Sequence, residues 1–248
     1  MSRYFLEVAY KGTNYSGFQS QHNANTIQAE LEKAFTILQK EKVILTGSSR
    51  TDTGVHALQN FFHFDFDRLL HSDFAYKMNA ILPGDIVVKQ IIPVAEEAHC
   101  RFDALSRDYK YYIYRHKNPF LTDIAFYYPY KLDIEILHEA AAIIKEYEDF
   151  TSFSKRNTQV KSFKCEMQES KWYWENECLV YYVKANRFLR GMVRALTATM
   201  LKAGRGKISL NQFREIIEAK DCCKASFAVP ALGLFLISVA YPPTLLGE

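Results

Sequence analysis

The segment Arg50-Thr51-Asp52-Thr53-Gly54-Val55-His56 stands between two strongly apolar stretches, residues 42–46 (Lys-Val-Ile-Leu-Thr) and residues 61–66 (Phe-Phe-His-Phe-Asp-Phe). The apolar stretches predict two strands that hold the polar segment between them as a loop. A carboxylate that lies between an arginine and a glycine on such a loop is well placed to act as a reactive acid. Asp52 is therefore the first candidate for chemistry. The alternative is an aspartate that only shapes the loop through an Asx-turn.

Composition excludes several classes of protein. The chain has 248 residues, of which 48% are hydrophobic, so it can bury one large core or two moderate ones. No apolar run approaches the roughly 20 residues that a membrane-spanning helix needs, and Glu7 interrupts the apolar start, so we expect a cytoplasmic protein without a membrane segment. The five cysteines show no CxxC spacing, which favours reduced thiols and no metal site.

Charge is distributed unevenly along the chain. Residues 151–207 contain twelve lysines and arginines and four glutamates, so this segment carries +8 within a chain whose net charge is +3. Aromatic residues such as Phe153, Phe163 and Trp172 are interleaved with the basic ones. This combination fits a polyanion that also offers bases for stacking, and the alternative is a solvated basic face without a partner.

The periodicity of the sequence predicts an α+β fold. Helices are expected after a cap at Asn25 or Thr26, and over residues 73–80, 133–147 and 187–203, with a further helix that a capping box of Ser209 and Gln212 begins. Strands are expected over residues 4–9, 86–92, 109–115 and 233–240, with a hairpin of residues 166–174 and 178–185. We therefore expect two similarly built domains, residues 1–104 and 105–248, with mixed, largely antiparallel sheets, helices on one side, and an active-site cleft between them.

Further candidates lie in the second half. Arg187, Arg190 and Arg194 have i, i+3 and i+7 spacing, so they form one basic stripe if residues 187–203 are helical. Such a stripe can simply face solvent, although Arg194 also borders the apolar stripe and could turn toward a carboxylate. Tyr109 begins a predicted strand, where an ordinary strand aromatic is the alternative reading.

Familiar cofactor motifs are missing from the sequence. No G-x-G-x-x-G follows a predicted strand, no HExxH or G-x-S-x-G occurs, and Gly204-Arg205-Gly206-Lys207 lacks the remaining residues of a phosphate-binding loop. The sequence therefore predicts no cofactor and no metal. An enzyme of this kind works with acid-base and nucleophilic side chains alone.

The loop around Asp52 resembles the catalytic loop of the pseudouridine synthases, and motifs along nearly the whole chain resemble the TruA family of tRNA pseudouridine synthases. These motifs are Tyr10-Lys11-Gly12-Thr13, Gly17-Phe18-Gln19, Arg50-Thr51-Asp52, Gly54-Val55-His56-Ala57, Leu82-Pro83-Gly84-Asp85-Ile86, Arg101-Phe102-Asp103-Ala104, Ser106-Arg107 with Tyr109, Asp149-Phe150-Thr151-Ser152-Phe153, Lys184-Ala185-Asn186, Met192-Val193-Arg194 and Gly233-Leu234-Phe235-Leu236. Gly191 departs from the family pattern, and a glycine inside a helix costs about 1 kcal/mol.

The resemblance implies an isomerase that converts uridine to pseudouridine at positions 38, 39 and 40 of the anticodon stem-loop of tRNA, without a cofactor and as a homodimer. It implies that Asp52 is the catalytic aspartate, that Tyr109 packs on the target base, and that Arg194 pairs with the aspartate. Leu234 would form an apolar wall, and Arg50 would hold the place of the flipped nucleotide. The residues that the resemblance or their charge assigns to RNA binding are Ala98, His99, Cys100, Arg101, Phe102, Lys155, Arg156, Lys161, Arg187 and Arg190.

Three alternatives stay open at this point. Asp52 can attack C1′, add to C6 of the base, or remove a proton from C2′. A non-catalytic tRNA-binding or RNA-folding module would keep the same cleft without the reaction. A nucleoside glycosidase would need a second carboxylate near Asp52, because one carboxylate must then activate water.

Overall fold

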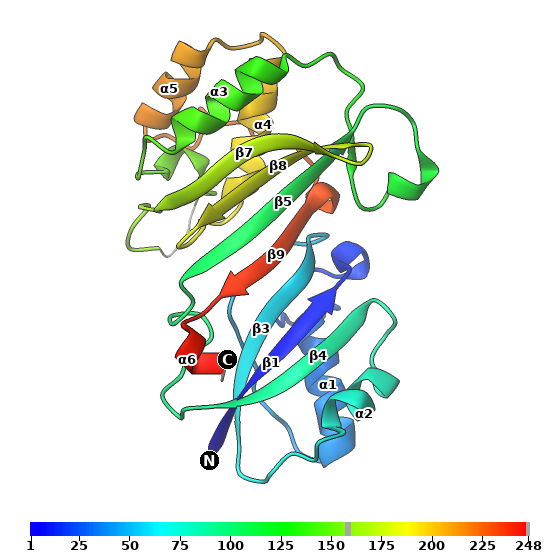
Figure 1. Cartoon of the computed structure of the whole chain (residues 1–248). Helices are drawn as coiled ribbons and strands as arrows, with labels where there is room; N and C mark the ends of the chain where they lie inside the picture. The colour runs from blue at the N-terminus through cyan, green and yellow to red at the C-terminus, as the bar shows by residue number, and fades with distance from the viewer. Residues whose placement is uncertain (157–159, 247–248) are drawn as a thin grey trace. The chain divides into compact units, whose positions relative to one another are not determined.

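The computed structural model describes residues 1–156 and 160–246, which form two compact units (Figure 1). The first unit contains Met1–Leu105 and the segment that begins at Phe235, and the second contains Ser106–Leu234. The sequence-based boundaries assigned all of residues 105–248 to the second domain. In the structure the segment from Phe235 onward groups with the N-terminal residues, where Phe235 pairs with His56.

The first unit is built on a mixed sheet in the order β4-β1-β3-β9. Strand β1 (Ser2–Tyr10) is antiparallel to both β3 (His56–Phe66) and β4 (Ile86–Val94), while β9 (Leu234–Ala240) runs parallel to β3. The strand expected over residues 42–46 is shorter and later, because only β2 (Thr46–Gly47) pairs with β3. A short helix, α6 (Pro243–Leu246), follows β9.

Two helices, α1 (Ile27–Gln39) and α2 (Phe74–Ile81), pack on one face of this sheet (Figure 1). The cap of α1 is Thr26, whose side chain accepts a hydrogen bond from Ala29 N at 3.3 Å, as one of the two expected caps. Phe35 of α1 meets Phe64, Phe66 and Phe74 edge to face, with ring centroids 5.2–5.4 Å apart. Buried aromatic pairs of this geometry join the helices to β3.

The second unit has an antiparallel sheet in the order β5-β8-β7. Its strands are β5 (Ser106–Tyr114), β7 (Met167–Glu175) and β8 (Cys178–Ala185), and the short β6 (Phe126–Tyr127) runs parallel to β5. The expected hairpin of β7 and β8 is confirmed, and its turn residue Asn176 has a φ of 54°.

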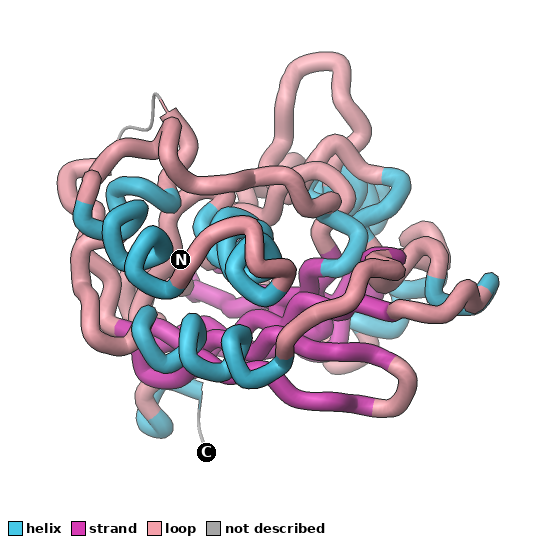
Figure 2. Tube along the Cα trace, turned by 90° about the horizontal axis from the view of Figure 1, so that it is seen from above, coloured by secondary structure: helices cyan, strands magenta, loops and turns pink. Residues whose placement is uncertain are grey.

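Helices α3 (Ile134–Ile144) and α4 (Met192–Gly204) pack against the strands of the second unit, and α5 (Leu210–Glu218) packs against these two helices (Figure 1). Figure 2 shows the helices and strands from above, coloured by type. Trp172 of β7 is buried and its indole N–H points at Met200 Sδ of α4, 3.4 Å away, which fixes that helix to the sheet. The capping box of Ser209 and Gln212 is present at the start of α5, as expected.

One expected helix begins later than its sequence pattern indicated. Helix α4 begins at Met192, so Arg187 and Arg190 lie in the segment that leads into it, and the proposed helical stripe with Arg194 is wrong. The physical reason is Gly191, which takes a φ of +75° in the left-handed region and cannot continue a right-handed helix backward. The glycine that the sequence placed inside the helix is its N-cap residue.

Within residues 1–156 and 160–246, none of the helices has both the length and the apolar character that crossing a bilayer requires.

Candidate active site

Buried polar side chains of β1 and β3 hold the Asp52 loop in place through hydrogen bonds. Asn60 of β3 donates to the carbonyl oxygen of Ser49 at 2.8 Å and to the hydroxyl of Tyr10 at 3.1 Å. The Tyr10 hydroxyl in turn lies 2.8 Å from the hydroxyl of Thr51. Because all these groups are buried, each bond they make is costly to lose, and the chain from β3 through β1 fixes the residue next to Asp52.

The backbone of the loop is also clamped by a second loop, residues 12–18. Phe18 N donates to the carbonyl oxygen of Thr51 at 3.1 Å. Gly17 has a φ of +108°, and a Cβ there would lie 3.2 Å from the same oxygen. At Gly12 a Cβ would lie 2.0 Å from the carbonyl oxygen of Val55, so only glycine permits this approach. The glycines of the two N-terminal motifs thus set the position of the Asp52 loop.

The loop closes on itself beside the carboxylate. Val55 N donates to the carbonyl oxygen of Asp52 at 3.1 Å, and Gly54 has a φ of +79° that suits this turn. Asp52 is half-buried, Arg50 is exposed and Thr51 is buried, so side chains alternate between the interior and the surface along the loop. A half-buried carboxylate on a fixed backbone can reach a ligand without moving its support.

His56 has a structural role in this loop. Its Nδ1 accepts a hydrogen bond from Gly12 N at 3.1 Å, and its ring stacks on Phe235 of β9 with centroids 4.5 Å apart. His56 therefore joins the loop of residues 12–18 and β9 to the end of the Asp52 loop.

The turn before β4 also supports the loop of residues 12–18. Asp85 accepts hydrogen bonds from the Tyr15 hydroxyl and from Asn14 Nδ2, the latter at 3.2 Å. Burial, together with the bond to Asp85, raises the pKa of Tyr15 above its usual value. The hydroxyl therefore stays protonated and serves as a permanent donor.

The other candidate substrate-binding residues lie in the second unit. Tyr109 of β5 is buried opposite Val183 of β8, and its ring meets Phe188 edge to face at 5.1 Å. Leu234, the last residue of this unit, is buried with 6% of its surface exposed.

Arg194 is oriented by a backbone carbonyl. From the first turn of α4, its Nε and Nη2 atoms donate to Val229 O at 3.0 and 2.7 Å. Nearby, burial raises the pKa of Tyr111 well above its usual value, with Arg194 acting in the opposite direction, and the Tyr111 hydroxyl donates to Pro230 O at 2.7 Å. The two hydrogen bonds from Arg194 to Val229 O hold its guanidinium in one orientation.

The candidate RNA-binding residues fall into two groups. In the first unit, the buried side chains of Ala98 and Cys100 anchor the turn formed by residues 98–103. The side chains of Arg101 and Phe102 are exposed on this turn, where they can contact RNA. In the second unit, Lys161, Arg156 and Arg190 are exposed.

Lys155 and Arg187 of the same group are half-buried. Lys155 N donates to Arg190 O at 3.0 Å, and the Lys155 side chain lies beside Gly191. Lys155, Arg156 and Lys161 flank residues 157–159, which lie outside the described part of the chain.

Two groups of side chains in the described residues come close enough to bind a metal ion. They are His63, His99 and Cys100, and Asp221, Cys222 and Cys223, with donor atoms within 4.8 Å of one another. In the first group, however, His99 Nδ1 accepts from Arg101 N at 3.2 Å, and the Cys100 thiol donates to Thr46 O at 3.1 Å. These hydrogen bonds show that His99 and Cys100 stabilise the turn formed by residues 98–103.

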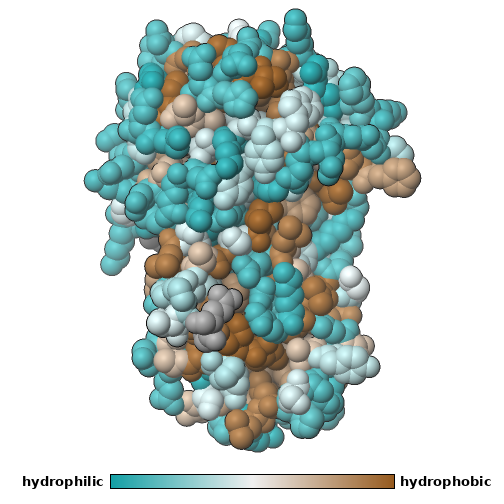
Figure 3. Space-filling view, in the orientation of Figure 1, coloured by the Kyte–Doolittle hydropathy of each residue, from teal (hydrophilic) through white to brown (hydrophobic). Residues whose placement is uncertain are grey.

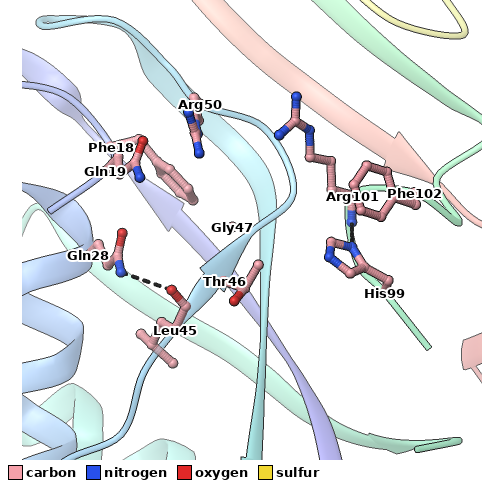
Figure 4. Close-up of a pocket in the computed structure, with 10 residues that line it drawn as sticks. All are labelled: Phe18, Gln19, Gln28, Leu45, Thr46, Gly47, Arg50, His99, Arg101 and Phe102. Atoms are coloured by element: carbon pink, nitrogen blue, oxygen red, sulfur yellow. Dashed lines mark hydrogen bonds between the residues drawn. The ribbon is translucent and has the colours of Figure 1, made fainter. Parts of the chain in front are cut away.

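A pocket of about 230 Å³ opens next to the Asp52 loop within the first unit (Figure 4). It is lined by residues of four segments, among them Phe18, Gln19, Gly47, Arg50, Arg101 and Phe102. The sequence predicted Arg50 as a substrate-binding residue and Arg101 and Phe102 as RNA-binding residues, but it did not predict that they share a pocket with Phe18, Gln19 and Gly47. No local signal marks the pocket, because its walls come from separate parts of the chain.

Known proteins resemble this chain over almost its whole length. A family model described as tRNA pseudouridine synthase matches residues 7–103 and 146–242. The tRNA pseudouridine synthase A of Parabacteroides distasonis is 45% identical over 247 residues, which are 99% of this chain and 98% of the relative. The proteins of that name from Bacteroides thetaiotaomicron and Staphylococcus aureus are 42% and 35% identical, over 100% and 94% of this chain and 94% and 89% of their own length.

The fold and the site together define a class of protein: an α+β protein that presents a carboxylate, Asp52, on a loop fixed by its neighbours. The matches specify it further, and the chain belongs to the TruA family of tRNA pseudouridine synthases, which are isomerases. The resemblance drawn from the sequence motifs is confirmed.

Proposed function

We propose that this chain isomerises uridine to pseudouridine at positions 38, 39 and 40 of the anticodon stem-loop of tRNA, with Asp52 as the catalytic carboxylate. The observation that carries the proposal is the construction of the Asp52 loop. Two glycines, the Tyr10–Thr51 contact and the Phe18–Thr51 bond fix its backbone, and they leave the carboxylate half-buried at the surface of the first unit.

The reaction needs little more than a positioned acid. The glycosidic bond between N1 and C1′ breaks, the uracil turns, and C5 forms a bond to C1′ while the proton of C5 is lost and N1 gains one. No atoms are exchanged with a second substrate, so no cofactor has to supply or take electrons. A glycosidase uses a second carboxylate to activate water, whereas here water has to stay out, and a single carboxylate suffices.

The remaining roles follow the family resemblance. Tyr109 would pack on the target base after it leaves the helix stack, which costs a few kcal/mol. Arg194, whose guanidinium is already oriented by Val229 O, would pair with the catalytic carboxylate, and Leu234 would supply an apolar wall. Arg50 is exposed beside Asp52, where it can hold the place of the flipped nucleotide.

A basic surface for the RNA backbone is the second support for the proposal. The +8 segment lies in the second unit, whose face in Figure 3 is largely hydrophilic. Lysines and arginines on such a face bind phosphates in a salt-dependent manner. We extend the proposal to a homodimer that works in the cytoplasm, and light scattering on the purified protein tests the dimer.

The decisive experiment uses Asp52→Asn and an anticodon stem-loop that carries 5-tritiated uridine. We expect tritium release to fall by at least roughly 10²-fold while RNA affinity stays close to that of the wild type. Asp67→Asn is the matched control, because Asp67 is an exposed aspartate of the same unit that only approaches Arg68 at 3.8 Å. Release by Asp52→Asn at the wild-type rate refutes the catalytic role of Asp52. Wild-type protein that binds RNA and releases no tritium supports the non-catalytic alternative.

A further inference from the structure

The pocket beside the Asp52 loop is built as a rigid recess. One wall is the ring of Phe18, which stacks on Phe62 of β3 with centroids 4.3 Å apart and 9° between the planes. Gly47 of β2 allows this, because a Cβ at position 47 would lie 2.1 Å from Phe18 Cε1. The neighbouring Gln28 donates to Leu45 O at 2.8 Å and accepts from Ser20 N at 3.0 Å, so its amide is fixed as well.

The opposite wall is the turn formed by residues 98–103. His99 N donates to Asp103 Oδ2 at 2.7 Å, and Phe102 N donates to His99 O at 3.1 Å, so the turn is closed by its own hydrogen bonds. The ring of Phe102 rests on the ring of His99, with centroids 4.2 Å apart, yet 73% of Phe102 is exposed. A large aromatic ring held rigidly at the mouth of a recess is a stacking platform.

The charge of the pocket is of one sign. Arg50 and Arg101 both line it, and among its described lining residues none is acidic. Figure 4 shows the guanidinium of Arg101 extending from the turn toward the side of Arg50, above the space between Phe18 and Phe102. The guanidinium of Arg101 lies 5.7 Å from the centroid of the Phe102 ring. Two guanidinium groups over a recess suit an anionic phosphate, and the aromatic and amide groups beneath them suit a base.

The size of the pocket limits what it can hold. Its volume of about 230 Å³ lies below the roughly 300–1,000 Å³ of sites for drug-sized ligands. It therefore accommodates one base rather than two. Asp52 is not among its lining residues, so a base in this pocket is not the one that reacts.

We propose that this pocket binds one nucleotide of the RNA substrate other than the target uridine, with the base stacked on Phe102 and the phosphate held by Arg101. The exposed amide of Gln19 lies at the edge of the recess, where it can bond to the edge of the base. The inference rests on the proposed function only in taking tRNA as the substrate. A nucleotide captured here positions the strand next to the catalytic loop, which makes Phe102 a determinant of the register in which the RNA is read.

The test is a set of anticodon stem-loops with cytidine in place of the target uridines, so that no turnover occurs, and with one nucleotide at a time made abasic. Affinities are measured for the wild type and for Phe102→Ala. We expect one position at which removing the base weakens binding of the wild type by roughly 5- to 150-fold. The same removal should change the affinity of Phe102→Ala by less than about twofold.

Phe120→Ala is the matched control, because Phe120 is an 85% exposed phenylalanine outside the pocket. This variant should keep the full penalty at the sensitive position. Arg101→Gln should lower the slope of log Kd against log salt concentration by about 1, as expected for one phosphate contact. The exposed positions of Phe102 and Arg101 make loss of folding a minor concern, and circular dichroism checks it.

The outcomes separate this inference from the proposed function. Tritium release by the wild type from the unmodified stem-loop, with no abasic position coupled to Phe102, overturns the pocket and leaves the reaction standing. A change in salt slope without such coupling also overturns it, because the pocket then holds only a phosphate. Coupling at one position supports the pocket whether or not tritium is released, and absence of release alone counts against the reaction.

Discussion

The close approach of two loops at Gly12 predicts a large functional effect from a single added methyl group. In Gly12→Ala the new Cβ would lie 2.0 Å from Val55 O and 2.8 Å from Val55 C, both backbone atoms. Ordinary contact begins at 3.4 Å, so the two loops have to separate by about 1.4 Å. Gly12 has no positive φ, so the effect comes from this contact alone.

The displacement acts directly on the Asp52 loop, since Val55 N is bonded to Asp52 O. A misplacement of about 1 Å can cost roughly 10²-fold in rate, so kcat/KM for tritium release should fall by about that factor. Overpacking of this kind also costs about 1–3 kcal/mol, which for a chain of this length corresponds to a melting temperature lower by roughly 2–12 °C. Tritium release and differential scanning fluorimetry measure the two effects.

Gly84→Ala is the matched control for this prediction. It introduces the same methyl group at a position with nothing within 4 Å and without a positive φ. Its activity should equal that of the wild type, and its stability should be equal or higher by up to about 1 kcal/mol, because alanine restricts the unfolded chain. If Gly12→Ala keeps the activity and melting temperature of Gly84→Ala, the loop is not positioned by this contact.

Three further predictions concern stability. Burial, aided by His99 and Arg3, lowers the pKa of His63 from 6.5 to about 4. As the pH falls, His63 is therefore protonated in the unfolded chain at a higher pH than in the folded protein. The free energy of unfolding should therefore fall by up to about 1.4 kcal/mol per pH unit from roughly pH 6.5 to 4, and His63→Gln should flatten that part of the pH profile in urea titrations. Gly191→Ala should cost about 1–2 kcal/mol through left-handed strain and also reduce tritium release, whereas Gly206→Ala, with φ +67° and open space around it, should lose only stability. Thr26→Ala should cost about 1 kcal/mol by removing the cap of α1, with unchanged tritium release; an unaltered melting temperature would show that the cap contributes nothing.

Much of the fold could be read from the sequence where the signal is local. The capping box of Ser209 and Gln212, the cap at Thr26 and the β7–β8 hairpin follow from residues a few positions apart, and the structure confirms them. The start of α4 could not be read in this way, because the hydrophobic periodicity continues backward through Arg187 and Arg190. The positive φ of Gly191 breaks the helix there, and periodicity carries no information about φ.

The candidate site follows the same rule: residues with a local signal were predicted, and the contacts that bring distant parts of the chain together were not. Asp52 stood out because its polar loop lies between apolar stretches, and the family motifs around it were confirmed as a family by the matches with known proteins. The pocket beside it was missed, since Phe18, Gly47 and Phe102 are separated by tens of residues in the sequence. The family resemblance predicted RNA binding for Phe102, but its exposure and its place at the mouth of a pocket came from the structure.

The sequence by itself determined most of the elements and the family, and it singled out Asp52 as the candidate acid, because capping, alternation and motif order are properties of neighbouring residues. Tertiary structure decided how the Asp52 loop is held and what lies beside it. Gly12 and Val55 are 43 positions apart and touch only because β1 and β3 pair in one register. The parallel pairing of β3 with β9 likewise brings together His56 and Phe235, which are 179 positions apart. Such contacts depend on sheet register and on backbone angles, which residue types constrain but do not specify.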